Sequence, residues 1–348
     1  MRNFLIVIGT RPEAVKLAPV VFALRRAGAE AHIVTTGQHP DLLPPTLAAF
    51  GLSADHALTD GRDWRAVLPG LRARIRCVRP DAVIVQGDTS SVMVGAMAAS
   101  VEGVPVHHVE AGLRSGDWMQ PFPEEHIRNA VTRLATLHFA PTPAAREALL
   151  SEGIRPCRVH MTGNTVIDAL RLILPDAGAA PPSGIDPDRR LVILTMHRRE
   201  TDGSGVRAVL RAASRIAARA DVQMIYPVHP RTAAADLRAA EAAGRIELVA
   251  PIAYDKFLPL LARAALVITD SGGVQEEAAA LGIPLICVRR VTERPEALLG
   301  RRAVLAGTDE AAILASAERL LALKEKGVPS QAFGDGHAAE RIADILTR

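Results

Sequence analysis

The sequence has little of several residue types that mark common protein classes. Three cysteines, Cys77, Cys157 and Cys287, occur among 348 residues, in no C-x-x-C or Cys/His pattern. This usage indicates a reducing compartment and argues against structural zinc, so we expect a cytoplasmic protein. No apolar run approaches the ~18 to 20 residues of a membrane span. The apolar run after Met1 leads into a Gly-Thr-Arg-Pro turn rather than a cleavage site, so we expect neither a signal peptide nor a membrane partner.

Aromatic residues and blocks of like charge are also scarce. Aromatic residues make up 3% of the chain, the formal net charge is only +3, and lysine and arginine form no continuous block. Proteins that bind nucleic acids usually combine a basic stripe with aromatic side chains that stack on bases. We therefore expect no nucleic-acid partner.

Short β-branched runs alternate with helical segments rich in alanine, leucine and arginine, a pattern typical of parallel sheets covered by helices. The length of 348 residues exceeds the ~250 to 300 at which one core usually stops growing, which predicts two domains. The expected strands of the first domain are 3–8, 31–36, 82–86, 104–109, 137–140 and 158–161. Those of the second are 190–196, 222–228, 246–250, 265–269, 284–288 and 303–306.

A stretch rich in proline and glycine, residues 175–184, separates the two series and reads as a linker. We therefore predict a first domain at 1–174, a linker at 175–188 and a second domain at 189–336. Ligands of doubly wound parallel sheets bind at the carboxyl ends of the strands. The expected architecture is α/β, two Rossmann-like doubly wound parallel-sheet domains with the active site in the cleft between them.

The most informative loop follows the strand at 265–269 and begins with Ser271-Gly272-Gly273. Glycines can adopt positive φ and allow close approach of a ligand, while the free N–H groups and dipole of the following helix attract negative charge. The pattern predicts a phosphate nest. Glu277, about one turn into the helix, is placed to accept both hydroxyls of a ribose. The alternative is that Ser-Gly-Gly only caps a helix.

Cations and acids also follow strands. Arg11 comes after the first strand, and Arg289, Arg290 and Arg294 come after the strand at 284–288. The arginine fork suits a diphosphate, although a solvated surface arginine is the alternative.

Asp88, Glu110 and Glu124 follow successive strands of the first domain, and His197 follows the first strand of the second. Clustered acids suit chemistry that removes and returns a carbon-bound proton, and His197 could assist a leaving diphosphate. Capping roles or Mg²⁺ binding are alternatives, of which we favour a metal-free site.

These segments resemble the non-hydrolysing UDP-N-acetylglucosamine 2-epimerase family over nearly the whole chain and in the family's order. The motifs that carry the resemblance are Gly-Thr-Arg-Pro-Glu-Ala-Val-Lys at 9–16, Gln-Gly-Asp-Thr at 86–89, His-Val-Glu-Ala-Gly-Leu-Arg at 108–114, Pro-Glu-Glu at 123–125, Thr-Gly-Asn-Thr-Val-Ile-Asp at 162–168, His-Arg-Arg-Glu at 197–200, Asp-Ser-Gly-Gly-Val-Gln-Glu-Glu at 270–277, Thr-Glu-Arg-Pro-Glu-Ala at 292–297 and Gly-Asp-Gly at 334–336.

The resemblance implies a GT-B fold whose last helix, 337–348, returns to the first domain, and a homodimer. It also implies that UDP is eliminated across C1 and C2 of UDP-N-acetylglucosamine to give a 2-acetamidoglucal, and then adds back to give UDP-N-acetylmannosamine without a cofactor. The matching catalytic positions are Asp88, Glu110, Glu124 and His197. The matching UDP contacts are Arg11, Ser271, Gly272, Gly273 and Glu277, with Lys16 and Arg294 at further functional positions.

The chain departs from the family pattern at three places, one of which is a shortened loop at about 53–64. Ile127 stands where the family commonly has asparagine. The segment at 37–45 keeps Gln38 and His39, which the resemblance links to an activating second UDP-N-acetylglucosamine, but places Pro44 and Pro45 where members usually carry Asp and Gln. Gln38 and His39 are therefore interpreted as a remnant of that site. A hydrolysing epimerase that releases N-acetylmannosamine and a GT-B glycosyltransferase stay open as alternatives.

Overall fold

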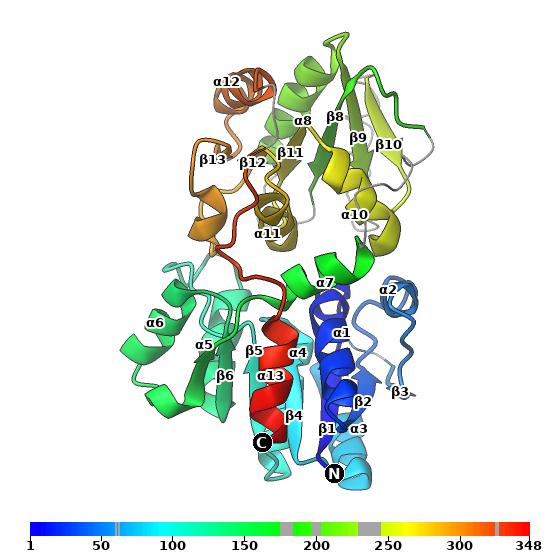
Figure 1. The fold of residues 1–348 in the computed structure, drawn as a ribbon, viewed down its shortest axis with the longest axis vertical. Coiled ribbons are helices and arrows are strands. Elements are labelled where there is room, and N and C mark those ends of the chain that lie inside the picture. Colours follow the sequence, from blue (N-terminus) through cyan, green and yellow to red (C-terminus); the bar gives the residue numbers. More distant parts are fainter. Residues whose placement is uncertain (60, 62, 175–183, 197–202, 229–244, 324–326) are drawn as a thin grey trace. The chain divides into compact units, whose positions relative to one another are not determined.

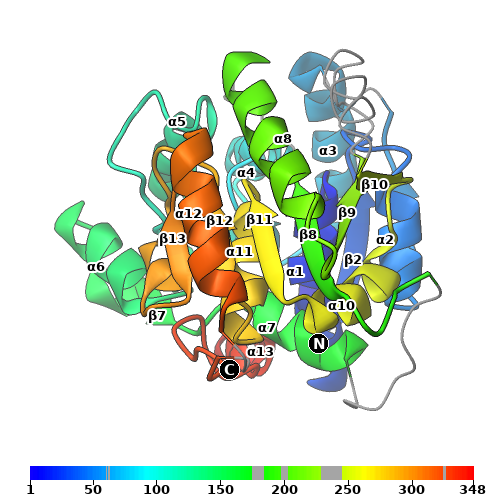
Figure 2. The same ribbon diagram turned by 90° about the horizontal axis from the view of Figure 1, so that it is seen from above.

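The chain folds into two compact units, each built on one parallel sheet (Figures 1 and 2). The computed structural model describes all residues except 60, 62, 175–183, 197–202, 229–244 and 324–326. Unit 1 comprises Met1–Ile173 and Phe333–Arg348, and unit 2 comprises Leu174–Ala332. The last sixteen residues or so of the chain therefore belong to the same unit as its beginning.

The sheet of unit 1 has the strand order β3-β2-β1-β4-β5-β6-β7 among the described residues, and all its paired strands run parallel. Its central strands are almost continuously apolar because helices cover both faces. The strands are β1 (Asn3–Ile8), β2 (Glu30–Thr35), β3 (His56–Ala57), β4 (Ala82–Gln86), β5 (Val106–Val109), β6 (Leu137–Ala140) and β7 (Val159–Met161).

The helices of unit 1 are α1 (Arg11–Arg26), α2 (Leu43–Ala49), α3 (Trp64–Val78), α4 (Ser90–Val101), α5 (Glu124–Leu134), α6 (Pro143–Ser151), α7 (Thr165–Ile173) and α13 (Ala338–Thr347). Of these, α1, α4, α6 and α7 each begin within four residues of the end of a strand. Pro44 and Pro45 lie in the first turn of α2, where the missing N–H group of proline costs no helical hydrogen bond.

Unit 2 repeats the plan with the strand order β10-β9-β8-β11-β12-β13, again parallel, in its described part. Its strands are β8 (Arg190–Thr195), β9 (Val222–Pro227), β10 (Ile246–Val249), β11 (Leu266–Thr269), β12 (Leu285–Cys287) and β13 (Ala303–Leu305). Its helices include α8 (Gly203–Ala217), α10 (Tyr254–Arg263), α11 (Gly272–Ala280) and α12 (Glu310–Leu321), with a 3₁₀ turn at Pro295–Leu298.

The predicted fold class, two Rossmann-like parallel-sheet domains, is confirmed. Each predicted strand segment occurs, with ends displaced by at most two residues (104–109, for example, is Val106–Val109). The two-residue strand β3 was missed because it is too short for a hydrophobic run to mark it.

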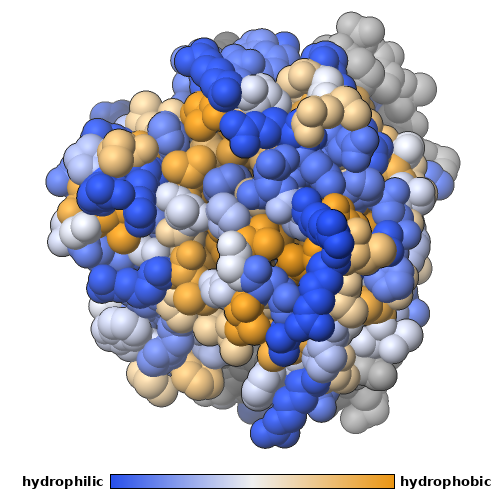
Figure 3. All heavy atoms as spheres, turned by 90° about the horizontal axis from the view of Figure 1, so that it is seen from below, coloured by the Kyte–Doolittle hydropathy of each residue, from blue (hydrophilic) through white to orange (hydrophobic). Residues whose placement is uncertain are grey.

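No helix in the described ranges is long and apolar enough to cross a membrane. The face shown in Figure 3 is mostly hydrophilic, with hydrophobic patches between the charged side chains. This mixture is usual for helices whose apolar sides pack on a sheet.

The C-terminal helix α13 is fastened to α7 by one carboxylate. Asp168 on α7 accepts hydrogen bonds from the backbone N–H groups of Ala338, at 3.2 Å, and Ala339, at 2.8 Å. It therefore caps α13 from another helix, satisfying N–H groups that have no partner inside a helix. Asn164 N also donates to the carbonyl of Phe333 at 2.7 Å. These bonds attach the returning chain to unit 1.

We expect Asp168→Ala to lower the free energy of unfolding by about 1 to 2 kcal/mol, because it removes this cap. Asp168→Asn keeps an acceptor oxygen and should lose less. Urea unfolding followed by circular dichroism measures both. Equal stability of wild type and Asp168→Ala would show that the cap contributes nothing.

Candidate active site

The strand-end loops of unit 1 pack directly on one another. A Cβ atom at Gly9, after β1, would lie 1.8 Å from Oγ of Ser91 in the first turn of α4, so only glycine fits there. Gln38, after β2, accepts a hydrogen bond from the Ser91 hydroxyl at 2.6 Å. The backbone N–H of His39 donates to the carbonyl of Gly9 at 3.1 Å. The loops after β1 and β2 thus both contact the start of α4.

Asp88 lies in the loop between β4 and α4, directly after Gly87, which fixes the conformation of that loop. Gly87 has φ +83°, a conformation that favours glycine. The carbonyl of Gly87 accepts a hydrogen bond at 2.8 Å from Nε2 of His108, on β5. Burial lowers the pKa of His108 to about 4, so its ring is neutral near pH 7 and carries the donated proton on Nε2.

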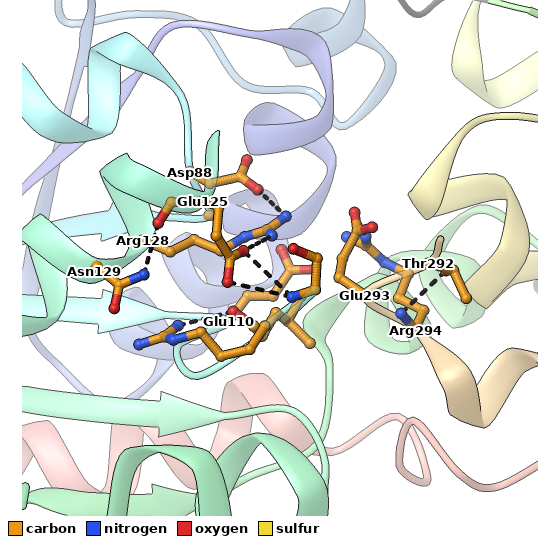
Figure 4. A network of polar contacts seen from close by, with 12 residues as sticks. Asp88, Glu110, Glu125, Arg128, Asn129, Thr292, Glu293 and Arg294 are labelled. Atoms are coloured by element: carbon orange, nitrogen blue, oxygen red, sulfur yellow. Dashed lines mark hydrogen bonds and ion pairs between the residues drawn. The ribbon is translucent and has the colours of Figure 1, made fainter. Parts of the chain in front are cut away.

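The Asp88 carboxylate itself contacts Arg128 of α5, whose guanidinium bridges two acids (Figure 4). Its two terminal nitrogens donate to Oδ2 of Asp88 at 2.5 Å and to Oε2 of Glu125 at 2.7 Å. Arg128 and Glu125 are buried, while the Asp88 side chain is 23% exposed. The arginine therefore fixes Asp88 at the edge of solvent by one charge-assisted bond, while its bond to Glu125 holds the arginine itself.

The sequence interpretation missed Arg128 and Glu125. The signal that marks them is their i, i+3 spacing on α5, which places oppositely charged groups side by side. Ile127, the residue that replaces the family's asparagine, packs with its side chain against the hydrophobic core beside β4 and α4.

Glu110 follows β5 in the left-handed conformation, with φ +59°, and is 6% exposed. Its Oε1 accepts hydrogen bonds from Nζ of Lys16 at 2.5 Å and from Nδ2 of Asn164 at 3.3 Å. Its Oε2 accepts one from the amide of Gln86. Positive φ is uncommon outside glycine, and such strain concentrates at functional sites.

A further acid, Glu13, is buried at the start of α1 with 1% of its surface exposed. It accepts hydrogen bonds from the Gly9 N–H at 2.7 Å, from the Thr10 hydroxyl at 2.8 Å and from the Thr89 hydroxyl at 2.7 Å. Burial raises the pKa of Glu13 to about 7 although these bonds lower it. Glu13 was not among the predicted site residues.

In unit 2 the Ser271-Gly272-Gly273 segment is the start of α11, with Ser271 as its N-cap residue. The predicted positive φ of its glycines was wrong, because neither Gly272 nor Gly273 has positive φ. A Cβ atom at Gly272 would instead lie 2.3 Å from the guanidinium of Arg294. Glycine is required there by close packing, and the anion-attracting element is the helix N-terminus itself.

Arg294 belongs to a buried ion network. Its Nε donates to Oε1 of Glu276 at 2.5 Å, and its NH1 donates to Glu293, which also accepts from Arg289 at 2.5 Å (Figure 4 shows Glu293 and Arg294). Two carboxylates thus offset two guanidinium groups. Arg290, the third predicted cation, is exposed.

Glu277, the predicted ribose acceptor, is buried on α11 and has a partner from another helix. The hydroxyl of Tyr254, at the start of α10, donates to Oε1 of Glu277 at 3.0 Å. One oxygen of the carboxylate is thereby oriented. Tyr254 is another residue that the sequence interpretation missed, because only the tertiary fold brings it to Glu277.

For two of the remaining predicted residues, the structure gives their position in the fold and their burial. Glu124 is the half-buried first residue of α5, where the helix dipole favours an acid. Arg11 is the first residue of α1 and is half-buried. His197 lies outside the described residues. Among the residues that the structure describes, no group of three or more His, Cys, Asp or Glu side chains is arranged to hold a metal ion.

Comparison with known proteins identifies the family. A family model described as UDP-N-acetylglucosamine 2-epimerase matches residues 23–347. The chain belongs to this family. The UDP-N-acetylglucosamine 2-epimerase of Escherichia coli (strain K12) is 38% identical, and the alignment covers 98% of this chain and 97% of the relative.

Two solved structures superpose closely on this chain. The S. aureus MnaA-UDP co-structure has a TM-score of 0.91 and 35% identity, covering 99% of this chain and 96% of that one. The UDP-GlcNAc 2-epimerase from Neisseria meningitidis bound to UDP-GlcNAc has a TM-score of 0.90 and 30% identity, covering 99% of both chains.

The raised pKa of Glu13 predicts a pH-dependent stability. A carboxyl group that binds its proton more tightly when folded makes the wild type lose stability as the pH rises from about 4.5 to about 7. Glutamine does not ionise, so Glu13→Gln should gain up to about 3 kcal/mol relative to wild type over this window. Urea unfolding at pH 5 and pH 8 measures the difference.

Glu147→Gln, at an exposed position of α6, controls for the loss of a carboxylate as such. A stability difference between Glu13→Gln and wild type that is the same at both pH values would contradict the assigned pKa.

Proposed function

We propose that this protein catalyses the reversible 2-epimerisation of UDP-N-acetylglucosamine to UDP-N-acetylmannosamine. Family membership supports the reaction class, and a family member solved with UDP-GlcNAc supports the substrate. The observation that carries the proposal is the set of fixed acids at the strand ends of unit 1, with Asp88 held by Arg128 and Glu110 by Lys16.

The proposed chemistry needs no redox step. The C2 proton is removed, the C1–O bond breaks with its electrons going to the UDP oxygen, and a 2-acetamidoglucal forms. UDP then adds back to C1 while a proton returns to C2 from the other face. Positioned acid and base groups carry both proton transfers, and we assign these roles to Asp88, Glu110 and Glu124, with His197 assisting the diphosphate.

We assign UDP binding to unit 2 and to the first loop of unit 1. The N–H groups of Gly272 and Gly273 at the start of α11 suit the diphosphate. The N–H of Ser271 donates to Oγ1 of Thr269 at 2.9 Å, so we assign the Ser271 hydroxyl to the diphosphate instead. Glu277 suits the ribose hydroxyls because Tyr254 already orients its carboxylate. Arg11 supplies a cation at the N-terminus of α1. The whole proposal requires that both units act on one substrate molecule.

The resemblance further supports a homodimer, and the few, widely spaced cysteines support a cytoplasmic location. Cys77, Cys157 and Cys287 are free thiols, as expected in a reducing compartment. Light scattering coupled to size-exclusion chromatography distinguishes monomer from dimer.

The deciding experiment incubates the protein with UDP-N-acetylglucosamine in D₂O without an acceptor and follows the sugar by NMR. We expect deuterium at C2 together with UDP-N-acetylmannosamine. Release of free N-acetylmannosamine would instead indicate a hydrolysing epimerase. If neither product forms with this or another UDP-N-acetylhexosamine, epimerisation is not the activity.

Asp88→Asn should lower the rate of C2 exchange by ~100-fold or more, the usual scale for a general acid or base. UDP affinity, measured by calorimetry, should stay within ~3-fold, since Asp88 is assigned to the sugar and not to the nucleotide. Asp344→Asn, at an exposed position on α13, is the control. Equal losses of exchange and of UDP binding would refute the catalytic assignment of Asp88.

Tyr254→Phe should weaken UDP binding by ~3- to 10-fold, because it leaves Glu277 without this hydrogen bond. The effect should fall on UDP, not on phosphate or pyrophosphate, because Glu277 is assigned to the ribose. Calorimetry with UDP and with pyrophosphate separates the two. Equal weakening of both ligands would show that Tyr254 supports α11 as a whole.

A further inference from the structure

One buried carboxylate joins the loop after β1 to the loop after β4. Oε2 of Glu13 accepts from the Gly9 N–H, and Oε1 accepts from the hydroxyls of Thr10 and Thr89. Thr89 lies 76 residues away in sequence and directly follows Asp88. The contact therefore crosses from one strand-end loop to its neighbour.

An acid in the first turn of a helix ordinarily completes a capping box. In that motif the acid accepts from the backbone N–H of the N-cap residue, whose own side chain caps the helix. The N-cap residue of α1 is Thr10, and its side chain makes no such cap bond. Glu13 bonds instead to the preceding residue, Gly9, and to Thr89. Helix capping alone does not explain this pattern.

The loop after β1 also packs closely against the loop after β4 and the start of α4. Gly9 lies so close to Ser91 that a Cβ atom would overlap its hydroxyl at 1.8 Å. The hydroxyl of Thr89 additionally accepts from the Val92 N–H at 3.4 Å as the N-cap of α4. One side chain, Thr89, thus connects the Glu13 carboxylate, the start of α4 and the residue next to Asp88.

Burial of this acid without a cationic partner is unfavourable, since burial is the largest influence on its pKa and favours the neutral form. The carboxylate receives only neutral donors among the contacts described, and the nearby charge of Asp88 is of like sign. A glutamine would fill the same space at lower cost. A group kept at a cost to stability is a candidate for a functional role.

We propose that Glu13 is a positioning residue for the reaction, holding Asp88 in place through Thr89. The inference rests on the proposed epimerisation. Asp88 is then fixed at three points: its carboxylate by Arg128, the preceding carbonyl by His108 and the following side chain by Glu13. Small displacements of a catalytic group lower the rate of chemistry more than they lower binding.

Thr89→Val removes the hydroxyl and keeps the shape. We expect it to lower kcat for C2 exchange by ~10-fold or more while UDP affinity changes by less than ~3-fold. Thr89→Ser restores the hydroxyl and should recover most of kcat. Glu13→Ala, which removes both acceptor oxygens, should resemble Thr89→Val. The double variant should be no slower than the slower single variant, because both changes break one contact.

Thr142→Val supplies the matched control. Thr142 is the N-cap of α6 in the same unit, and its hydroxyl accepts from the Ala145 N–H at 3.2 Å. The substitution removes an equivalent cap away from Asp88, so it should lower stability comparably and leave kcat unchanged. If Thr89→Val lowers kcat no more than Thr142→Val does, or if the double variant shows the product of the two single losses, the proposal is wrong.

Amide hydrogen exchange provides a readout that does not depend on activity. Thr89→Val and Glu13→Ala should each increase exchange in a peptide covering residues 87–92 by ~10-fold, and Thr142→Val should not. If the wild type shows no epimerisation but these increases occur, the proposed function fails and the connection between the loops stands. Unchanged exchange in both variants overturns the connection itself.

Discussion

Charged side chains buried at the ends of parallel strands require partners, and the site of unit 1 is organised by this requirement. Removing a charge from water costs several kcal/mol unless hydrogen bonds and an opposite charge compensate. Glu110 obtains Lys16, Gln86 and Asn164, and Glu125 obtains Arg128. Since these partners come from different elements, each pairing also sets the spacing between elements. The requirement for compensation is therefore what fixes the position of the acids.

Asp88 differs from these groups because part of its carboxylate stays in contact with solvent. Arg128 holds one of its oxygens, and that same arginine is held by the buried Glu125. The arrangement holds one oxygen of the carboxylate and leaves part of the side chain accessible, as the proposed proton transfer requires. Such preorganisation is what a general acid or base needs, because geometry must be in place before a proton moves.

In the proposed function, unit 2 has a different role, which is to bind the diphosphate anion. The charge of Arg294 is compensated inside the protein by ion pairs with Glu276 and Glu293. Its guanidinium packs on Gly272 and supports the start of α11. The N–H groups of that helix terminus then supply the fixed positive end of a dipole. Arg294 thus supports the helix terminus, and the terminus attracts the anion. This explains why the buried Arg294 packs directly on Gly272, 22 residues earlier in the sequence.

Strand ends were predictable from the sequence because apolar runs mark buried parallel strands, and the placement of Asp88 and Glu110 in loops followed from them. The reason for Gly272 was not predictable, since its φ depends on where α11 begins and its packing depends on Arg294. Arg128, Tyr254 and Glu13 were missed for the same reason: no local pattern states which distant group a side chain will meet.

Glu13 is an example of a residue whose contacts cannot be predicted from the sequence and whose proposed role depends on those contacts. The motif at residues 9–16 has an acid in the first turn of α1, and the capping-box pattern would assign this acid to helix capping. Only the fold shows that its carboxylate reaches Thr89, on a loop that follows another strand. Local consistency would favour a neutral residue at a site buried this deeply, so the acid conflicts with stability. A destabilising residue of this kind is expected where a chain gives up stability for function. Here the destabilising acid, Glu13, contacts Thr89, the residue that follows Asp88.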